Sequence, residues 1–364
     1  MNLNRRNVTI GLIKNLLPGK YYDDIFINKL LLRQNLKILN LNQMLWCSIH
    51  GFLPHEYKLY DLENNDYKSY VPSRNNFQKR RLNGSYNAIL GNKILFEKHI
   101  KIVISGIDKL HVVESIGYIE NGFLKSLNNN IVNDDFTSLI PFLEKNDLVM
   151  KPVSGDGGVG LVLIRKEDDQ YIFENKEVTW NELVEKIRNL NDYLIQERFK
   201  QKGFSNDIYA DSVNTIRVAT MIDPVSHKPF VAYAFHRFGL PKSGIADNVN
   251  QGGLFSLVDV NDGRLSMLVD YSISGEKKHY EFHPFTAKKV YNELVPNWNI
   301  LTNKVLEMAG RMPYMKYVGW DVVLSDDEFY ILEGNVSPGI GFQMVKPMKD
   351  FPEAWSFFKH YKYV

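Results

Sequence analysis

The chain has 364 residues, of which 44% are hydrophobic and 24% are charged, so it can bury a large core and form about two or three lobes. Its 44 Lys and Arg residues nearly balance its 42 Asp and Glu residues, which argues against nucleic acid as the main partner. The single cysteine, Cys47, excludes an internal disulfide and is typical of a reducing cytoplasm, and we interpret it as a small core residue.

Residues 1–90 are expected to be mostly helical and irregular, without a signal peptide, because their first apolar run is too short. Apolar side chains at Ile27, Leu30, Leu31 and Ile38 predict a helix over residues 27–38. No apolar run reaches the roughly eighteen residues that a membrane-spanning helix needs. We therefore expect a cytoplasmic protein that spans no membrane.

A second helix is predicted over residues 90–99, with Asn92 as its N-cap. Its first turn contains Lys93, where the helix dipole disfavours a cation, and this indicates an anionic partner. Residues 101–105 and 112–119 are rich in β-branched side chains and predict strands, and residues 137–145 predict a helix.

A glycine-rich loop follows the predicted strand 148–152, which ends at Lys151-Pro152, and precedes a second strand over residues 161–165. Its glycines, at positions 155, 157, 158 and 160, let a backbone approach a ligand and turn N–H groups toward phosphate oxygens. The loop has neither the Walker nor the Rossmann spacing, so a flexible hairpin tip remains the alternative. Lys151, directly upstream, favours a phosphate site.

Two strands with buried arginines come next, after a helix over residues 179–189 that Thr179 and Glu182 cap, and a strand over residues 192–199. Arg217 interrupts the apolar strand 214–222, and Arg237 interrupts the apolar strand 230–239. A buried arginine needs a paired anion, which could be a structural carboxylate or a ligand. The strands alone leave both open.

The C-terminal part begins with a polar loop at residues 247–253 and a strand over residues 254–259. A loop at residues 282–284 and a helix over residues 297–310 follow, and a short aromatic helix ends the chain.

Residues 321–335 predict a β-hairpin with acidic ends. A three-residue turn over Asp326, Asp327 and Glu328 would pair Ser325 with Phe329 and set Asp321 opposite Glu333. Glu333 and Asn335 share one face because side chains alternate along a strand. Two carboxylates and an amide oxygen are ligands for Mg²⁺ that also binds substrate phosphates. The alternative is an acidic strand end that faces water.

These pieces together resemble the ATP-grasp superfamily over roughly residues 85–345, and most closely the sugar-transfer-associated and teichuronopeptide-type proteins of bacterial polysaccharide clusters. No single piece is decisive, but their common order is hard to obtain by chance. The matching pieces are Asn92-Lys93, Met150-Lys151-Pro152, the glycine loop 155–160, residues 196–199, Thr215-Ile216-Arg217, residues 235–239, residues 248–253, Gly319-Trp320-Asp321 and residues 332–335.

The resemblance implies an α+β (α/β) ATP-grasp fold, in which two α+β lobes sandwich ATP behind a mostly helical N-terminal region. We expect that region over residues 1–90, the N-terminal lobe with its glycine flap over 91–200, and the C-terminal lobe with the metal site over 201–364. The implied cofactors are ATP and Mg²⁺, for which Mn²⁺ could substitute.

The resemblance also assigns roles. Lys93 and Lys151 would hold the α- and β-phosphates, and the flap with Ser154, Gly155, Gly157 and Gly158 would cover them. Gln196, Glu197 and Phe199 would read adenine, and Asp207 is a candidate for the ribose. Asp321, Glu333 and Asn335 would bind the metal, and Arg217 would lie near the transferred phosphate. His236, Arg237, Asn248 and Gln251 would face the acceptor. The planar fork of Arg237 could bind a carboxylate in bidentate fashion, with a salt bridge to Asp247 as the structural alternative.

The implied reaction is a carboxylate–amine ligation through an acyl phosphate, acting on a sugar acid or amino acid of a surface polysaccharide. The substrates would be a small-molecule or glycan carboxylate and an amine. Two alternatives remain: a phosphotransferase with a hydroxyl acceptor, and a nucleotide-binding module without turnover. The sequence names neither the acid nor the amine, and it leaves the oligomeric state open.

Overall fold

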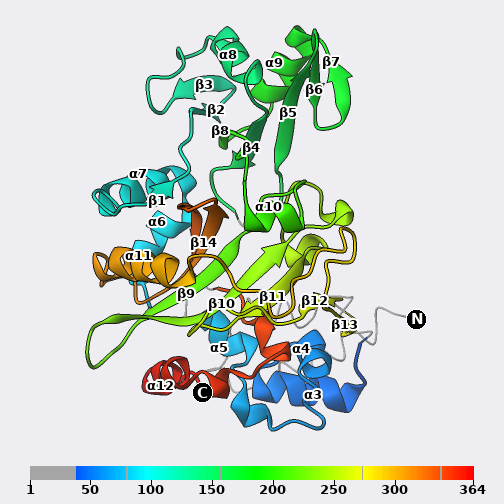
Figure 1. Cartoon of the computed structure of the whole chain (residues 1–364), viewed down its shortest axis with the longest axis vertical. Coiled ribbons are helices and arrows are strands. Elements are labelled where there is room, and N and C mark those ends of the chain that lie inside the picture. The colour runs from blue at the N-terminus through cyan, green and yellow to red at the C-terminus, as the bar shows by residue number, and fades with distance from the viewer. Residues whose placement is uncertain (1–37, 79–80, 156, 273, 337) are drawn as a thin grey trace.

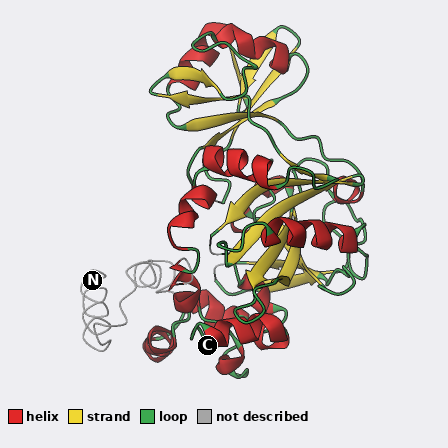
Figure 2. Cartoon of the chain, turned by 90° about the vertical axis from the view of Figure 1, so that its left-hand side faces the viewer, coloured by secondary structure: helices red, strands yellow, loops and turns green. Residues whose placement is uncertain are grey.

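The computed structural model describes residues 38–78, 81–155, 157–272, 274–336 and 338–364. A small sheet lies above a large one, and a layer of helices from both ends of the described chain lies below (Figure 1). The view turned by 90° shows the same order (Figure 2). Nearly all of the helix predicted over residues 27–38 lies outside the described residues. No helix among those residues is long and apolar enough to cross a membrane.

The large sheet has eight strands in the order β1-β15-β14-β9-β10-β11-β12-β13. Only the β1–β15 pair among them is parallel. The bounds are β1 (Leu110–Val112), β9 (Ile216–Ile222), β10 (Pro229–Phe238), β11 (Leu254–Val258), β12 (Leu268–Tyr271), β13 (Lys277–Tyr280), β14 (Tyr317–Ser325) and β15 (Glu328–Asn335).

Helices cover both faces of the large sheet. On one face the core side chains of β9, β10 and β14 pack with α6 (Asn87–Gly91), α7 (Lys93–Val103) and α11 (Trp298–Gly310). On the other face, one end packs with α3 (Leu41–His50), α4 (Pro54–Leu59) and α12 (Pro352–His360). Helix α5 (Ser73–Gln78) belongs to the same lower layer (Figure 1). Cys47 is fully buried in this layer, as the sequence predicted.

The small sheet has seven strands in the order β3-β2-β8-β4-β5-β6-β7. Its core packs with α8 (Ile140–Leu143) and α9 (Trp180–Arg188), and α9 begins with the predicted capping box of Thr179 and Glu182. The strands are β2 (Gly117–Glu120), β3 (Phe123–Ser126), β4 (Leu148–Pro152), β5 (Val162–Glu167), β6 (Gln170–Phe173), β7 (Lys176–Val178) and β8 (Tyr193–Glu197). Together the two sheets and their helices make the expected α+β fold.

Two strand predictions are wrong. Residues 101–103 continue helix α7, because Ile100 and Ile104 lie one helical turn apart on its buried face. Residues 112–119 form no single strand. The chain leaves β1 in the large sheet, crosses at residues 113–116 and enters β2 in the small sheet. No pattern in the sequence predicted the short strands β3, β6, β7, β12 and β13.

The hairpin pairs as predicted but by another route. Its turn has two residues, since Ser325 pairs with Glu328, and Asp326 has φ +51°. A register shift next to Asp321 then adds a residue to β15, so that Asp321 still lies opposite Glu333. Asp321 does not begin the strand, because β14 starts at Tyr317. It lies inside the sheet, 2% exposed, which excludes an acidic strand end that faces water.

Candidate functional site

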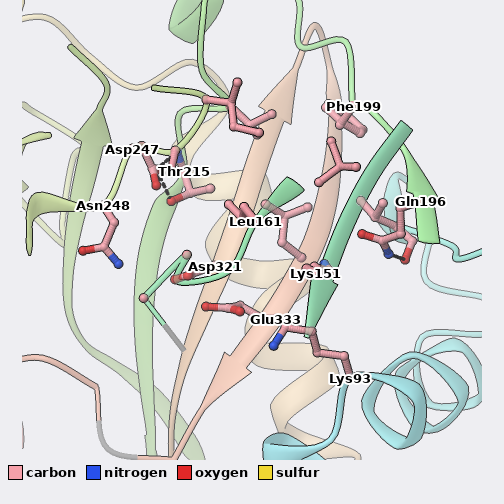
Figure 3. Close-up of a pocket in the computed structure, with 18 of the residues that line it drawn as sticks. Lys93, Lys151, Leu161, Gln196, Phe199, Thr215, Asp247, Asn248, Asp321 and Glu333 are labelled. Carbon is pink, nitrogen blue, oxygen red and sulfur yellow. Dashed lines mark hydrogen bonds between the residues drawn. The ribbon is translucent and has the colours of Figure 1, made fainter. Parts of the chain in front are cut away.

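A cavity lies where the small sheet faces the large one. Figure 3 shows Lys93, Lys151, Asp321 and Glu333 around one space. The predicted site residues that line this cavity are Lys93, Lys151, Gly155, Gly157, Gly158, Gln196, Glu197, Phe199, Arg237, Asn248, Asp321 and Glu333. Those that do not line it are Ser154, Asp207, Arg217, His236, Gln251 and Asn335.

Two lysines approach the cavity from different elements. Lys93 is the first residue of α7, where the Asn92 side chain caps the helix as predicted, and its Nζ donates to Gly155 O at 2.7 Å. Lys151 lies near the end of β4. Burial lowers the pKa of Lys151 to about 8, Glu333 and Glu97 oppose that change, and the nearby Lys93 adds to it. Two cations in one cavity favour an anionic ligand.

The glycine loop between β4 and β5 reaches from the small sheet to the lobe of the large sheet, which we call the lower lobe. Gly155, Gly157 and Gly158 have φ between +71° and +124°, a region that side chains rarely adopt. Gln251 Nε2 donates to Gly157 O at 2.9 Å, so this side chain binds the loop instead of lining the cavity. Ser154 forms a bridge with Asn92. The loop is therefore held at three points, by Asn92, Lys93 and Gln251.

Asp321 on β14 is held by two arginines from neighbouring strands. Arg217 on β9 donates from Nε to Oδ1 and from Nη2 to Oδ2, the latter at 3.0 Å. Arg237 on β10 donates from Nη2 to Oδ2 at 2.8 Å. Burial alone would raise the pKa of Asp321, but Arg217 and Arg237 outweigh burial and hold it below its usual range. The predicted buried arginines thus pair with one carboxylate.

The other edge of Arg237 is also in use. Its Nε and Nη2 donate to Thr215 Oγ1 at 3.0 and 2.5 Å, and Nε lies 3.4 Å from Asp247 Oδ2. Thr215 in turn donates from its N and Oγ1 to Asp247 Oδ2, at 2.7 and 2.5 Å. The expected bidentate fork is therefore occupied, and the predicted salt bridge to Asp247 is present. Of the three guanidinium nitrogens of Arg237, Nη1 alone has no hydrogen-bond partner among the described residues.

Glu333 and Asn335 extend this network on β15. Burial and the Asp321 carboxylate raise the pKa of Glu333. Asn335 Nδ2 lies 3.4 Å from Glu333 Oε1 and donates to Gly319 O at 3.3 Å, which leaves its Oδ1 as an acceptor. Among the described residues no three His, Cys, Asp or Glu side chains gather as a metal site. The oxygen atoms of Glu333 and Asn335 still fit a hard cation. Asp321 could add an oxygen ligand only while it also accepts hydrogen bonds from Arg217 and Arg237.

The segment between the lobes carries the predicted adenine contacts. Glu197, at the end of β8, and Phe199 line the cavity, and Phe199 packs 4.7 Å from the Tyr330 ring. The Gln196 side chain donates to Val113 O at 3.3 Å and to Ser115 Oγ at 3.0 Å. Asp207 lies in α10 (Phe204–Ile208), away from the cavity lining, so the geometry gives no support for a ribose contact.

His236 lies on the wrong face of β10 for a role in acceptor binding. It is 0% exposed and hydrogen-bonded to Ser205 Oγ at 3.1 Å, and burial together with Arg237 lowers its pKa to about 3. Neighbouring side chains of a strand point to opposite faces, so His236 cannot join Arg237 at the cavity. The same alternation could have found Thr215, which lines the cavity two residues before Arg217 and was not predicted as a site residue.

Comparisons with known proteins bear on the fold. The sequence matches the family described as "Sugar-transfer associated ATP-grasp" over residues 73–353. A search of curated proteins finds no match.

Similar solved structures include the ADP complex of N5-carboxyaminoimidazole ribonucleotide synthetase, which is 12% identical with a TM-score of 0.40 and aligns 73% of this chain with 53% of its own. VanG D-Ala:D-Ser ligase from Enterococcus faecalis is 10% identical, with a TM-score of 0.38 over 76% of this chain and 65% of its own. D-alanine–D-alanine ligase from Bacillus anthracis is 12% identical, with a TM-score of 0.33 over 75% and 70%. The chain spans about half the length of the first of these.

Proposed function

Because the chain belongs to the sugar-transfer associated ATP-grasp family, we propose that it is an ATP-dependent carboxylate–amine ligase that forms an amide through an acyl phosphate. Its substrate would be a sugar acid or amino acid used in the synthesis of a surface polysaccharide, and it would act in the cytoplasm. The observation that carries the proposal is the convergence of Lys93, Lys151, Arg237, Asp321 and Glu333 in one cavity.

The nucleotide is assigned to the part of the cavity that the small sheet and the start of α7 line. Lys93 and Lys151 bind the phosphates, the loop 154–160 covers them, and Glu197 and Phe199 lie beside the adenine. Lys93 now donates to Gly155 O, so phosphate binding exchanges this contact for a stronger one to an anion. Glu333 and Asn335 hold Mg²⁺ with a share from Asp321, and Mn²⁺ could replace it. When bound, the ion neutralises charge on the transferred group.

The acceptor side is assigned to Arg237 and Asn248, which line the cavity. An acceptor carboxylate oxygen attacks the γ-phosphorus, and the bond to the bridging oxygen breaks, which gives an acyl phosphate and ADP. An amine then attacks the acyl carbon, expels phosphate and loses a proton. With its fork occupied, Arg237 contributes the N–H groups of one nitrogen, Nη1, which can orient a single oxygen in line with the γ-phosphate.

The experiment is an ADP-release screen with Mg²⁺ over uronic acids and amino acids, taken singly and in pairs. A ligase releases ADP and phosphate only when acid and amine are both present, and the product gains one amide bond by mass. ADP with a phosphorylated hydroxyl would identify a phosphotransferase. ATP binding without turnover on any pair would favour a regulatory module.

A further inference from the structure

Glu97 is a buried carboxylate that the proposed function does not use, and it lies behind Lys93 without lining the cavity itself. It lies on α7, one turn after Lys93, and is 3% exposed. Its Oε2 accepts from Ser115 N at 3.0 Å and from Ser115 Oγ at 2.5 Å. Its Oε1 is buried and has no hydrogen-bond partner in the part of the chain that the structure describes. An unsatisfied carboxylate oxygen is costly, so this atom calls for a donor.

The bonded oxygen fixes Glu97 to the joint between the two lobes. Val113 N donates to Ile331 O of the large sheet, and Ile116 N donates to Ile195 O of the small sheet, so residues 113–116 bridge them. Ser115 lies in this bridge, and its Oγ accepts from Gln196 Nε2 on β8 at 3.0 Å. One chain of hydrogen bonds therefore links α7, the bridge and the strand that leads into the adenine segment.

The free oxygen has a complementary cation nearby. Lys151 Nζ makes no hydrogen bond or ion pair among the described residues. Lys151 lies on β4 two residues before Val153, whose O accepts from Lys93 N at 2.9 Å, so the end of β4 meets the start of α7 beside it. The two carboxylates that stabilise the Lys151 charge are Glu333 and Glu97. Glu333 is also the carboxylate assigned to Mg²⁺. Once a cation occupies Glu333, Glu97 is left as the counter-charge for Lys151.

We propose that Glu97 is a positioning residue that holds the Lys151 ammonium for the nucleotide phosphates and ties it to the joint between the lobes. The inference rests on the proposed function, which assigns Lys151 to ATP. Glu97 touches no nucleotide itself, and it acts through Lys151 alone.

The test compares Glu97→Gln with Glu56→Gln in the full chain. Glu56 is a matched control, since it is also 3% exposed and accepts from a backbone N–H, at Leu53, and from a serine hydroxyl, at Ser73, away from the cavity. Dissociation constants for ATP with Mg²⁺ and for adenosine are measured by calorimetry. Glu97→Gln should weaken ATP about tenfold and adenosine less than twofold. Glu56→Gln should change neither.

A double-mutant cycle isolates the route through Lys151. In a Lys151→Met background, Glu97→Gln should leave ATP binding unchanged or tighten it, because only repulsion between Glu97 and the phosphates remains. Equal loss in both backgrounds, or equal weakening of ATP and adenosine, would overturn the proposal. If Glu97→Gln does not fold, Ser115→Ala keeps the charge and should weaken ATP about threefold without affecting adenosine. Should the unmodified chain bind no ATP, the proposed function fails first.

Discussion

The same face of three adjacent strands has two different ends. At one end, Asp321 of β14, Arg217 of β9 and Arg237 of β10 form a charged network at the cavity. At the other end, Tyr317 of β14 and Tyr233 of β10 share a hydrogen bond of 2.5 Å. There Tyr317 packs on aromatic side chains of α12. The strands are continuous, so the covering elements decide which end is core and which is site.

Between the two ends, β14 and β9 carry small residues. Gly319 lies beside Ala219 on β9. A Cβ at Gly319 would lie 2.9 Å from Arg217 Cδ and 2.6 Å from Pro338 Cβ. The absent side chain thus gives Arg217 room to reach Asp321. The comparison teaches that one alternating pattern can supply both a core and a site, with glycine at the boundary.

The largest effect is expected from substitutions that remove a carboxylate from the charged end. Asp321→Asn leaves Arg217 and Arg237 buried without their shared counter-charge, which should cost about 3–5 kcal/mol of unfolding free energy and abolish ADP formation. Glu333→Gln should also abolish ADP formation but leave the unfolding free energy nearly unchanged, because it removes a repulsion with Asp321. Urea denaturation and ADP release measure the two effects. Normal turnover in Glu333→Gln would refute the metal assignment.

The next prediction concerns the covering helices at the aromatic end. Burial raises the pKa of Glu56 on α4 to about 7, against hydrogen bonds from Leu53 and Ser73 that lower it. A raised pKa in the folded state means that Glu56 contributes stability below the unfolded value of about 4.5 and loses it as pH rises to about 7. The decline should be about 3 kcal/mol.

Glu56→Gln should remove that pH dependence and leave ATP turnover intact. Urea melts at several pH values between about 4.5 and 7 measure it. If the unmodified chain and the variant show the same pH profile, Glu56 ionises in the folded protein as it does in the unfolded one.

Some features of the fold and of the candidate site could be predicted from the sequence. The Asn92 cap, the lysine at the end of β4 and the pairing of Asp321 with Glu333 follow from local patterns. The predicted turn length was wrong, but the predicted pairing of Asp321 with Glu333 is correct because a register shift compensates for the shorter turn. The ion pairs of Asp321 could not be predicted, since they depend on β9 lying between β10 and β14 in the sheet. Strand order is a property of the folded chain and has no local signal near residue 217, 237 or 321.

A smaller effect is expected at Thr215, the residue directly before strand β9. Thr215→Val removes the hydroxyl between Asp247 and Arg237, and we expect a loss of about 1–3 kcal/mol in unfolding free energy. We also expect about a tenfold loss in kcat/KM for the acceptor, while the KM for ATP stays constant. Thr215→Ser should restore both.

Thr220→Val, five residues later and inside β9, is the matched control. Thr220 is also buried, and its Oγ1 accepts from Trp320 Nε1 at 2.8 Å on the core side. It should lose similar stability and keep its acceptor kinetics. Equal kinetic losses in Thr215→Val and Thr220→Val would show that Thr215 acts only on stability.

The smallest effect concerns the cover of the charged end, which is a glycine-rich loop, whereas packed helices cover the aromatic end. The loop 154–160 touches the lower lobe through Gln251 Nε2 and Gly157 O, and few apolar side chains anchor it. Such a loop opens at low cost, so its amides should exchange quickly without nucleotide and more slowly with a nonhydrolysable ATP analogue.

The substitution Gln251→Met keeps the side-chain volume and removes one hydrogen bond of about 1 kcal/mol. It should speed exchange without nucleotide about fivefold, by opening the loop more often. It should raise the KM for ATP by less than that factor, because contacts between the loop and the bound phosphates still close it. Slow exchange that is the same with and without the analogue would mean that the loop is a fixed wall of the cavity.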